Sequence, residues 1–399
     1  MRCGRPFSAK TNKLLWLPAL LGGLLVWISC QTAPVKEFDL YTPQTCGDIR
    51  GSVNRDDSIK FLNTISVFFK NNCFKDVIRD VEIAKANLKD KTFSLIGETV
   101  ELFIPEGSVT KYVLESYERG YLSFLSAVSY AKLGGNAEVF PELNKIYNEE
   151  TALTYNHGRD PVNSILQAAM WDNFQMKGFS SRPFWQWLAR DKSLDQVTKD
   201  FALEQIRKID ANPQKYASET KWQIYASELF PPVDWHMNIV DSKHGYFEIS
   251  PLRKFPKACA SGGGLLFPTT SWFDKLSRRH AYSYHPLVNV KSWIRAPFGL
   301  TYGISVFATG AAITVGGCSA VFSAREGATL CGYSIMYGVA VMQHGSEFAK
   351  NTLKPDLRHW ELVPAAFYIH PVPTGSDAQS KPANSCLDGV EPYDLYRVL

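Results

Sequence analysis

Apolar residues recur at helical spacing through the first half of the chain, from residue 57 to about residue 230. The clearest example is the aromatic segment 117–135, YERGYLSFLSAVSYAKLGG. Its apolar side chains fall on one stripe of a helix, at Tyr117, Tyr121, Phe124, Leu125 and Val128. Gly134 and Gly135 then predict the end of that helix. Aromatic residues at this spacing are typical of a packed core, so we predict a structural helix here.

A second amphipathic segment, residues 138–148, follows the two glycines and predicts an antiparallel partner helix. The small residues Ala127 and Ala131 stand where the two helices would approach each other. The same alternation of helix and turn continues in residues 161–174, 184–190 and 194–209. This pattern is typical of tetratricopeptide-like hairpins, although a regular period of about 34 residues is not present. We therefore predict an irregular set of helical hairpins.

The pattern changes after Pro231 and Pro232. Residues 233–295 hold short apolar runs separated by Pro, Gly and His, which predict short strands and loops, and the segment ELVPAAFYIHP (361–371) predicts another strand. The expected fold class is therefore α+β, with helical hairpins first and a smaller α+β domain after them. The predicted division is a signal peptide in 1–29, a tether in 30–55, a tetratricopeptide-like helical domain in 56–230 and an α+β domain in 231–399.

Two apolar arms interrupt the second domain. The segment 297–324 has 28 consecutive residues without a charge, and 328–343 is uncharged again after Arg325 and Glu326. The first arm is long enough to cross a bilayer, which takes roughly 20 residues. Glycine is frequent in it, and the second arm is short. We therefore favour a buried, small-residue-rich hairpin or core strands, with membrane insertion as the alternative.

The first residues have the pattern of an export signal. A basic stretch precedes the apolar run 14–28, which ends at Ser29 and Cys30. The small residue and cysteine resemble the lipobox of bacterial lipoproteins, and that resemblance implies cleavage before Cys30 and acylation of this new N-terminal cysteine. An uncleaved anchor and cleavage elsewhere are the alternatives. We expect a lipoprotein of the bacterial cell envelope, anchored in the outer membrane and facing the periplasm, so that its N-terminal lipid makes the membrane contact.

The charge of the chain is concentrated in this same segment. The protein has 43 Lys and Arg residues against 39 Asp and Glu. Four of the basic residues, Arg2, Arg5, Lys10 and Lys13, lie in the first 29 residues, which contain no acid. The remaining chain is formally neutral, and a neutral body is not expected to bind nucleic acid.

Cysteine usage agrees with export, because an oxidising compartment permits disulfides. Without Cys3 and Cys30, six of the eight cysteines remain. Six cysteines allow about 15 connectivities. The pairing we favour is Cys318 with Cys331, Cys46 with Cys73, and Cys259 with Cys386.

Two motifs together resemble an uncharacterised family of bacterial envelope lipoproteins with tetratricopeptide-like helices. The first is a Tyr-Glu-Arg helix that ends in Leu-Gly, and the second is an Asp-x-Arg-x-Trp run that leads through a proline into a strand. The matching residues are Tyr117, Glu118, Arg119, Leu133, Gly134, Asp356, Arg358, Trp360 and Pro364. The resemblance implies no enzymatic activity. We interpret Asp356 and Arg358 as a structural clasp, with Trp360 capping the apolar arms.

A search for reactive groups finds weak candidates. Ser334 lacks the second glycine of a nucleophile elbow, and Cys331 with His344 or His359 is better explained by a disulfide. The compact His and carboxylate cluster is Asp234, His236, Asp241 and His244. Its spacing matches no established set of metal ligands. We therefore predict no catalytic residue, no metal and no cofactor.

The function these patterns favour is that of a non-catalytic periplasmic scaffold or adaptor. Stacked helical hairpins form grooves that bind extended peptides or partner helices, so the expected partner is another envelope protein. Two alternatives remain open. One is a protein that inserts the arms of 297–343 into a membrane, and the other is a hydrolase with a site between the domains.

Overall fold

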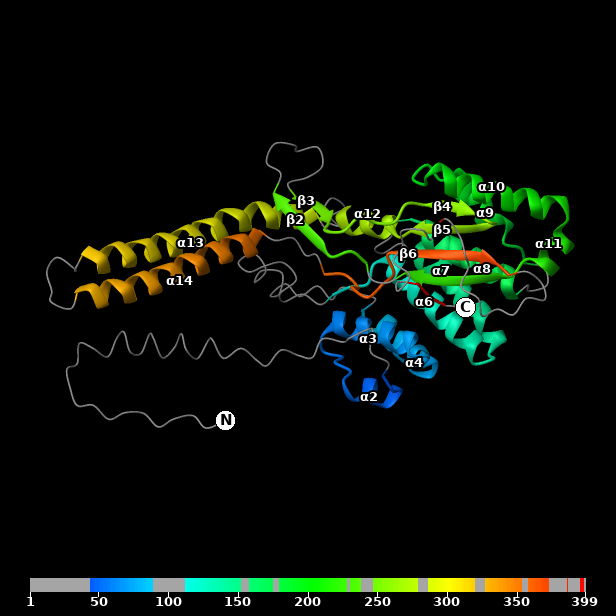
Figure 1. Ribbon diagram of the computed structural model, residues 1–399, viewed down its shortest axis with the longest axis horizontal. Coiled ribbons are helices and arrows are strands. Elements are labelled where there is room, and N and C mark those ends of the chain that lie inside the picture. The colour runs from blue at the N-terminus through cyan, green and yellow to red at the C-terminus, as the bar shows by residue number, and fades with distance from the viewer. Residues whose placement is uncertain are drawn as a thin grey trace. The chain divides into compact units, whose positions relative to one another are not determined.

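The computed structural model of the chain has an α+β fold, mostly helical, with a small antiparallel sheet formed largely by its second half. The structure describes residues 44–88, 112–151, 158–174, 179–227, 230–237, 247–278, 286–319, 327–353, 358–372, 386 and 395–397. The chain divides into two compact units, residues 1–43 and 44–399. Every helix and strand described below belongs to the second unit (Figure 1). The predicted fold class is confirmed.

The second unit begins with three helices, α2 (Cys46–Gly51), α3 (Ser58–Lys70) and α4 (Phe74–Leu88). Thr45 caps α2 by accepting a hydrogen bond from the backbone N–H of Asp48. Asp57 caps α3 in the same way, because its carboxylate accepts from the N–H groups of Ile59 and Lys60.

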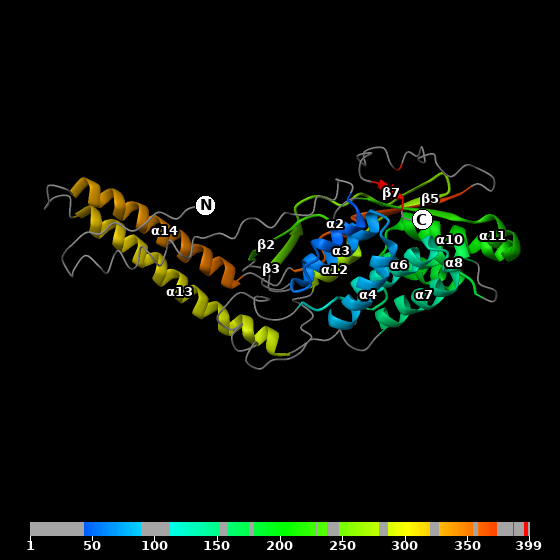
Figure 2. The ribbon, with the colours of Figure 1, turned by 90° about the horizontal axis from the view of Figure 1, so that it is seen from below.

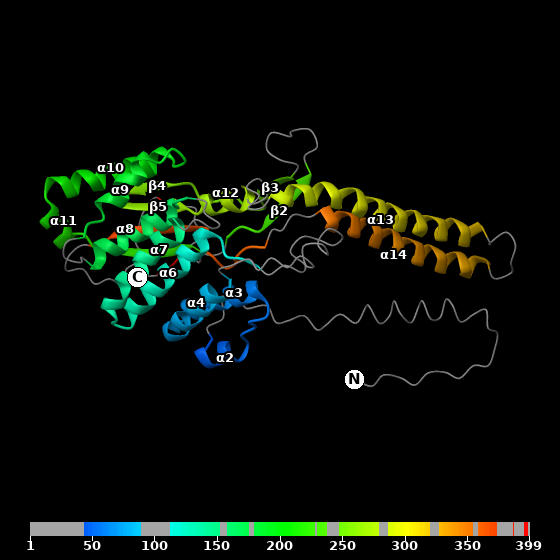
Figure 3. The ribbon, with the colours of Figure 1, turned by 180° about the vertical axis from the view of Figure 1, so that it is seen from behind.

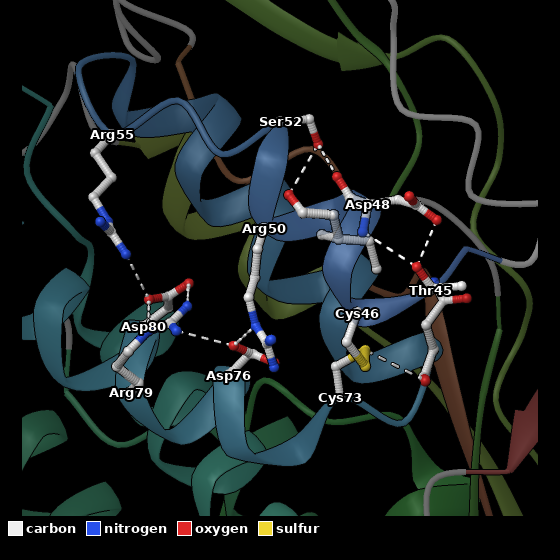
Figure 4. Close-up of polar contacts among 12 residues, drawn as sticks. Thr45, Cys46, Asp48, Arg50, Ser52, Arg55, Cys73, Asp76, Arg79 and Asp80 are labelled. Carbon is white, nitrogen blue, oxygen red and sulfur yellow. Dashed lines mark hydrogen bonds and ion pairs between the residues drawn. A yellow bond between two sulfur atoms is a disulfide. The ribbon is translucent and has the colours of Figure 1, made fainter.

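A disulfide and a chain of ion pairs join α2 to α4 (Figure 4). Cys46 is bonded to Cys73, and Arg50 makes two short hydrogen bonds with the carboxylate of Asp76, at 2.7 and 2.8 Å. Arg79 also contacts Asp76, at 3.0 Å. The tether predicted for residues 30–55 therefore includes a helix, α2, which a disulfide ties to Cys73 directly before α4.

Helices α6 (Ser116–Lys132) and α7 (Asn136–Thr151) form the predicted antiparallel hairpin. Glu115 and Glu118 form a capping box at the start of α6, in which the Glu118 carboxylate accepts from the Glu115 backbone N–H at 2.8 Å. Gly134 ends the turn with φ +81°, a left-handed conformation that favours glycine.

Four more helices follow: α8 (Pro161–Phe174), α9 (Arg182–Arg190), α10 (Gln196–Ala211) and α11 (Pro213–Glu219). Asp160 begins α8 by accepting from the N–H of Asn163, and Asp195 begins α10 by accepting from that of Thr198. Helices that follow each other along the chain pack as neighbours, which Figure 2 shows from below. The helices predicted for this region are thus confirmed.

The main sheet has five antiparallel strands in the order β4-β5-β6-β1-β7. The strands are β1 (Trp222–Ser227), β4 (Cys259–Ser261), β5 (Gly264–Pro268), β6 (Ala366–Pro371) and β7 (Leu395–Arg397). β6 is central, with Ile369 opposite Ile224 of β1 and Leu265 of β5. Cys259 of the edge strand is disulfide-bonded to Cys386. The strand predicted for 361–371 is confirmed, but it begins after Pro364.

A two-stranded sheet, β2 (Val233–Met237) with β3 (Phe247–Pro251), and helix α12 (Thr270–Arg278) complete the body. β1 follows α11 almost directly and pairs with β6 and β7 near the end of the chain. Because this pairing joins the helical half to the sheet, the compact unit does not divide at residue 230 as the predicted domain boundary required.

The aromatic stripe of α6 lies at the centre of the core. The Tyr121 ring lies 5.1 Å from Trp272 of α12, 5.4 Å from Trp360 and 5.9 Å from Phe367 of β6, measured between ring centroids. Tyr117 stacks on Trp272 at 5.5 Å. All of these rings are buried, so the stripe is a structural core, as predicted. Its aromatic partners come from the sheet and α12.

Candidate functional site

The apolar arms form two long helices, α13 (Pro286–Ser319) and α14 (Gly327–Leu353), which run side by side in Figures 1 and 3. Together they contain many glycines, each of which costs a water-exposed helix about 1 kcal/mol relative to alanine. The contact between the two helices explains several of them.

Glycines let the two backbones touch. A Cβ atom added to Gly310 would lie 2.6 Å from the carbonyl oxygen of Gly338, and one added to Gly345 would lie 2.7 Å from the backbone N of Phe307. A Cβ on Gly317 would overlap the side chain of Ser334. Close approach through small residues is the usual way in which helices pack inside membranes, where apolar side chains gain little by leaving lipid.

A disulfide closes one end of this hairpin. Cys318, at the end of α13, is bonded to Cys331 in the second turn of α14. The contact of Gly345 with Gly303 lies toward the opposite end, with 2.8 Å between the added Cβ and the Gly303 oxygen. These contacts fix the two helices antiparallel, with the disulfide end as the tip and the other end as the base.

The sides of the hairpin that face away from the seam are apolar and exposed. Ten large apolar side chains are between 38% and 70% exposed: Tyr302, Ile304, Phe307, Ile313, Val315, Tyr333, Ile335, Met336, Tyr337 and Val339. Exposed apolar residues are normal when scattered singly on a soluble surface. Here they are concentrated on two adjacent helices, and such a concentration marks an interaction site.

Two exposed hydroxyl groups of α13 form hydrogen bonds within their own helix. The hydroxyl of Ser305 donates to the Thr301 carbonyl at 2.7 Å, and the hydroxyl of Thr309 donates to the Ser305 carbonyl at 2.8 Å. Such bonds satisfy a hydroxyl without water. An apolar medium can therefore surround this part of α13 without leaving these groups unpaired.

The length of the uncharged surface matches a bilayer. Thr301–Ser319 is the one segment in the described part of the chain that is long and apolar enough to cross a membrane. Its 19 residues span about 28 Å, close to the ~30 Å thickness of the hydrocarbon core. Only 11% of this segment is buried, so it is not a core helix of the body. The burial that we favoured from the sequence is therefore wrong for the outer sides of both arms.

The two motifs of the family resemblance meet in the body. The carboxylate of Glu118 accepts hydrogen bonds from the Tyr112 hydroxyl at 2.7 Å and from the backbone N–H of Trp360 at 3.1 Å. Burial raises the pKa of Glu118 to about 7. This carboxyl group thus ties α6 to the segment that leads into β6.

The remaining motif residues are structural as well. Arg119 is buried and bonds to the Glu149 carboxylate at 2.8 Å and to the Leu114 carbonyl at 2.7 Å. Arg358 lies over the Tyr112 ring, 5.8 Å from its centroid. Asp356 lies outside the described residues. Trp360, which we expected to cap the apolar arms, packs against Tyr121 in the core.

A buried charged cluster between α8 and α12 was not found from the sequence. Asp160 is fully buried, forms an ion pair with Lys275 at 2.8 Å and accepts from the Trp272 indole at 2.9 Å. Burial, together with the nearby Asp160, raises the pKa of Glu150 to about 8. An aspartate directly before a proline that begins a helix signals a cap, but nothing in the linear pattern locates its distant partners.

A second buried carboxyl group, Asp172, joins α8 to α11 and β1. It accepts hydrogen bonds from the Tyr216 hydroxyl at 2.9 Å and the Trp222 indole at 2.8 Å. Burial raises its pKa to about 6. All of its named partners belong to the packed core, so the arrangement is that of a structural polar network.

The body also has an open cavity of about 410 Å³ beside α8, α10, α12 and β5. Its apolar lining includes Val162, Ile165 and Phe267, which are buried. Asp195 and Lys257, both exposed, are among its polar residues. The cavity has room for one or two large side chains of a ligand or of a partner.

Among the described residues, the candidates for chemistry are not brought together as a reactive site. Cys331 is held in a disulfide, so it is not a thiol nucleophile. Asp234 and His236 lie two residues apart on β2, while Asp241 and His244 fall outside the described residues. The Sγ atoms of Cys46 and Cys73 lie close to Asp76, but their disulfide removes the thiolates that a metal would need.

The three disulfides join the same pairs that the sequence suggested, and they indicate an oxidising, extracytoplasmic compartment. Cys30, the expected lipidation site, lies outside the described residues. Comparisons with models of protein families, with curated proteins and with solved structures found no match. The resemblance to envelope lipoproteins therefore stays an expectation based on the two motifs.

Proposed function

We propose that this protein is a non-catalytic, extracytoplasmic protein that inserts the α13–α14 hairpin into a lipid bilayer. The observation that carries the proposal is the concentration of exposed apolar side chains on two antiparallel helices, one of which contains an uncharged span as long as a hydrocarbon core is thick. Exposing this surface to water costs free energy, whereas the hydrocarbon of a bilayer is as apolar as the surface itself.

The backbone of the hairpin is also suited to a lipid environment. Both segments are helical, so their N–H and C=O groups are bonded within each helix. The seam is made by glycines in close contact, which supports helix association without any hydrophobic driving force. The disulfide between Cys318 and Cys331 would keep the two arms paired during insertion, since it links them next to the turn.

An N-terminal lipid on Cys30 would be a second attachment, and it belongs to the same proposal of a bacterial envelope protein. The inserted hairpin would be an attachment independent of that lipid. Both attachments would then leave the α+β body in the oxidising compartment that its disulfides indicate.

The test uses the chain that begins at Gln44, so that neither the signal segment nor a lipid contributes. All three disulfides and the buried core lie within this unit, and we expect it to fold alone. It should float with phospholipid vesicles and resist extraction at alkaline pH. A chain that remains a detergent-free soluble monomer and does not float would contradict the proposal.

A matched pair of variants makes the test specific to the hairpin. Phe307→Asp with Val315→Asp places two carboxylates on the exposed apolar surface, each costing about 2.5–3.5 kcal/mol at the centre of a membrane. Flotation should be lost. Leu133→Asp with Leu203→Asp adds the same charges at exposed positions of the body and should leave flotation unchanged.

A second candidate function, an adaptor that binds another envelope protein, is favoured by the cavity beside α8 and α10. Its apolar lining and charged rim suit an apolar side chain on an extended peptide. Val197→Trp would fill the mouth of the cavity, while Leu203→Trp changes an exposed residue of α10 that does not line it. Crosslinking in intact envelopes should recover a partner with the wild type and the Leu203 variant. Equal recovery of the partner with the Val197 variant would contradict this second candidate function.

A further inference from the structure

The charged residues of the two helices fall at one end of the hairpin, while Arg325 and Glu326, which lie between the helices in the sequence, have opposite charges that cancel. The charged residues of α13 are Lys291 and Arg295, in its first third, and those of α14 are Glu347 and Lys350, in its last turns. Because the seam makes the helices antiparallel, with Cys318 beside Cys331 at the tip, these four residues lie together at the base. The base therefore has a net formal charge of +2, and the span between Thr301 and Ser319 has none.

The base lies within reach of lipid headgroups if the uncharged span fills the hydrocarbon core. Arg295 precedes Thr301 by six residues, which is about 9 Å of helix, and Lys291 lies about 6 Å further. Lys350 follows Gly345, which packs at the level of Gly303, by about 7 Å. The headgroup layer is about 5–8 Å thick, and charges act over a Debye length of about 8 Å.

We infer that the membrane surface at the base of the hairpin is rich in anionic lipid, whose headgroups are attracted to Lys291, Arg295 and Lys350. The inference rests on the proposed insertion of α13 and α14. Basic residues that flank a membrane segment attract anionic lipid, and two net charges correspond to a preference of roughly tenfold or more. Because the chain after residue 29 is formally neutral and the hairpin has a net charge of +2, the rest of the chain has a net negative charge, so the preference belongs to the hairpin.

The experiment compares vesicles of pure phosphatidylcholine with vesicles containing about one third phosphatidylglycerol, using the chain from Gln44 onward. The expected result is insertion into both, with partition at least several-fold stronger into the anionic vesicles. The triple variant Lys291→Gln, Arg295→Gln, Lys350→Gln should lose most of this preference and still insert. High salt should reduce the preference of the wild type, because salt screens exposed charges.

The control variant removes three exposed lysines of the body, Lys75→Gln, Lys192→Gln and Lys215→Gln, which changes the net charge equally. It should keep the preference of the wild type. Equal partition of the wild type into both vesicles, or an undiminished preference in the base variant, would overturn the inference and leave insertion standing. Failure to insert into either vesicle would instead overturn the proposed function.

Discussion

Helix α6 and the hairpin α13–α14 have similar sequences in one respect, because both combine aromatic residues with many small ones. Their surroundings are opposite. α6 is buried on nearly every side, and its ionisable residues Glu118 and Arg119 are buried with it. The hairpin buries its glycine seam and exposes its large apolar side chains. Apolar content therefore does not determine burial, which depends on what the rest of the chain supplies as a cover.

The difference lies in the partners of the polar groups. Around α6, distant segments supply a hydroxyl, a backbone N–H and a carboxylate, from Tyr112, Trp360 and Glu149, to the charged groups of the helix. The exposed hydroxyls of α13 bond to carbonyl groups of their own helix. A helix whose polar groups need partners from other segments must pack inside the protein. A helix whose polar groups are hydrogen-bonded within the helix itself can be surrounded by lipid.

The largest difference in stability between the two regions should appear when one aromatic ring is removed from each. Tyr121→Ala deletes a buried ring that contacts Trp272, Trp360 and Phe367, and should lower the free energy of unfolding by about 3–5 kcal/mol. Tyr302→Ala removes a ring that is 52% exposed and should change it by less than about 0.5 kcal/mol. Urea unfolding followed by tryptophan fluorescence measures both. A large loss with Tyr302→Ala would mean that the hairpin surface is covered after all.

The glycine seam should give the next largest effect. Gly310→Val places a Cβ against backbone atoms of Gly338 and Met342, so the helices must separate; overpacking costs about 1–3 kcal/mol. We expect weaker pairing of the arms and a loss of vesicle insertion. Gly316→Val is the control, because a Cβ there meets nothing within 4 Å. Insertion that fails equally with both variants would show that helix propensity, and not the seam, limits the hairpin.

Much of this contrast can be predicted from the sequence, but its decisive part cannot. Helical spacing predicts α6 to α10 closely, and the uncharged arms predict either a hairpin or core strands, of which the structure has the hairpin. The buried position of Glu118 could not be foreseen, because its partner Trp360 is about 240 residues away and contributes only a backbone N–H. The exposure of Phe307 could not be foreseen either. Whether a segment is buried depends on where all the other segments of the chain lie in space. The pattern of residues along the sequence does not contain that information.

The buried carboxyl groups make stability depend on pH in the body. The pKa values of Glu118, Glu150 and Asp172 are raised by burial, to about 7, 8 and 6. A raised pKa means that the folded state binds the proton more tightly than the unfolded state. The contribution of these three groups to stability is therefore greatest below their unfolded pKa values near 4 and falls as pH rises toward 8.

We expect the melting temperature of the chain from Gln44 onward to be lower at pH 8.5 than at pH 5.5, with a loss of about 1–3 kcal/mol in stability. Glu118→Gln should flatten this dependence, since the amide does not ionise. Vesicle insertion should not follow the same pH curve, because the uncharged span of the hairpin contains no carboxyl group. A pH profile that is unchanged in the variant would remove Glu118 as a cause.

The smallest effects should come from removing a serine hydroxyl that makes the same local hydrogen bond in each of the two regions. Ser129 in α6 donates to the Leu125 carbonyl, and Ser305 in α13 donates to the Thr301 carbonyl, each at 2.7 Å. Ser129→Ala should cost about 0.5–1 kcal/mol in urea unfolding, because it removes a buried hydrogen bond and leaves a small void. Ser305→Ala should leave both unfolding and insertion unchanged within error, since its hydroxyl lies on an exposed side. If Ser305→Ala costs as much as Ser129→Ala, that side of α13 must be packed against protein, and lipid would then be the wrong partner for it.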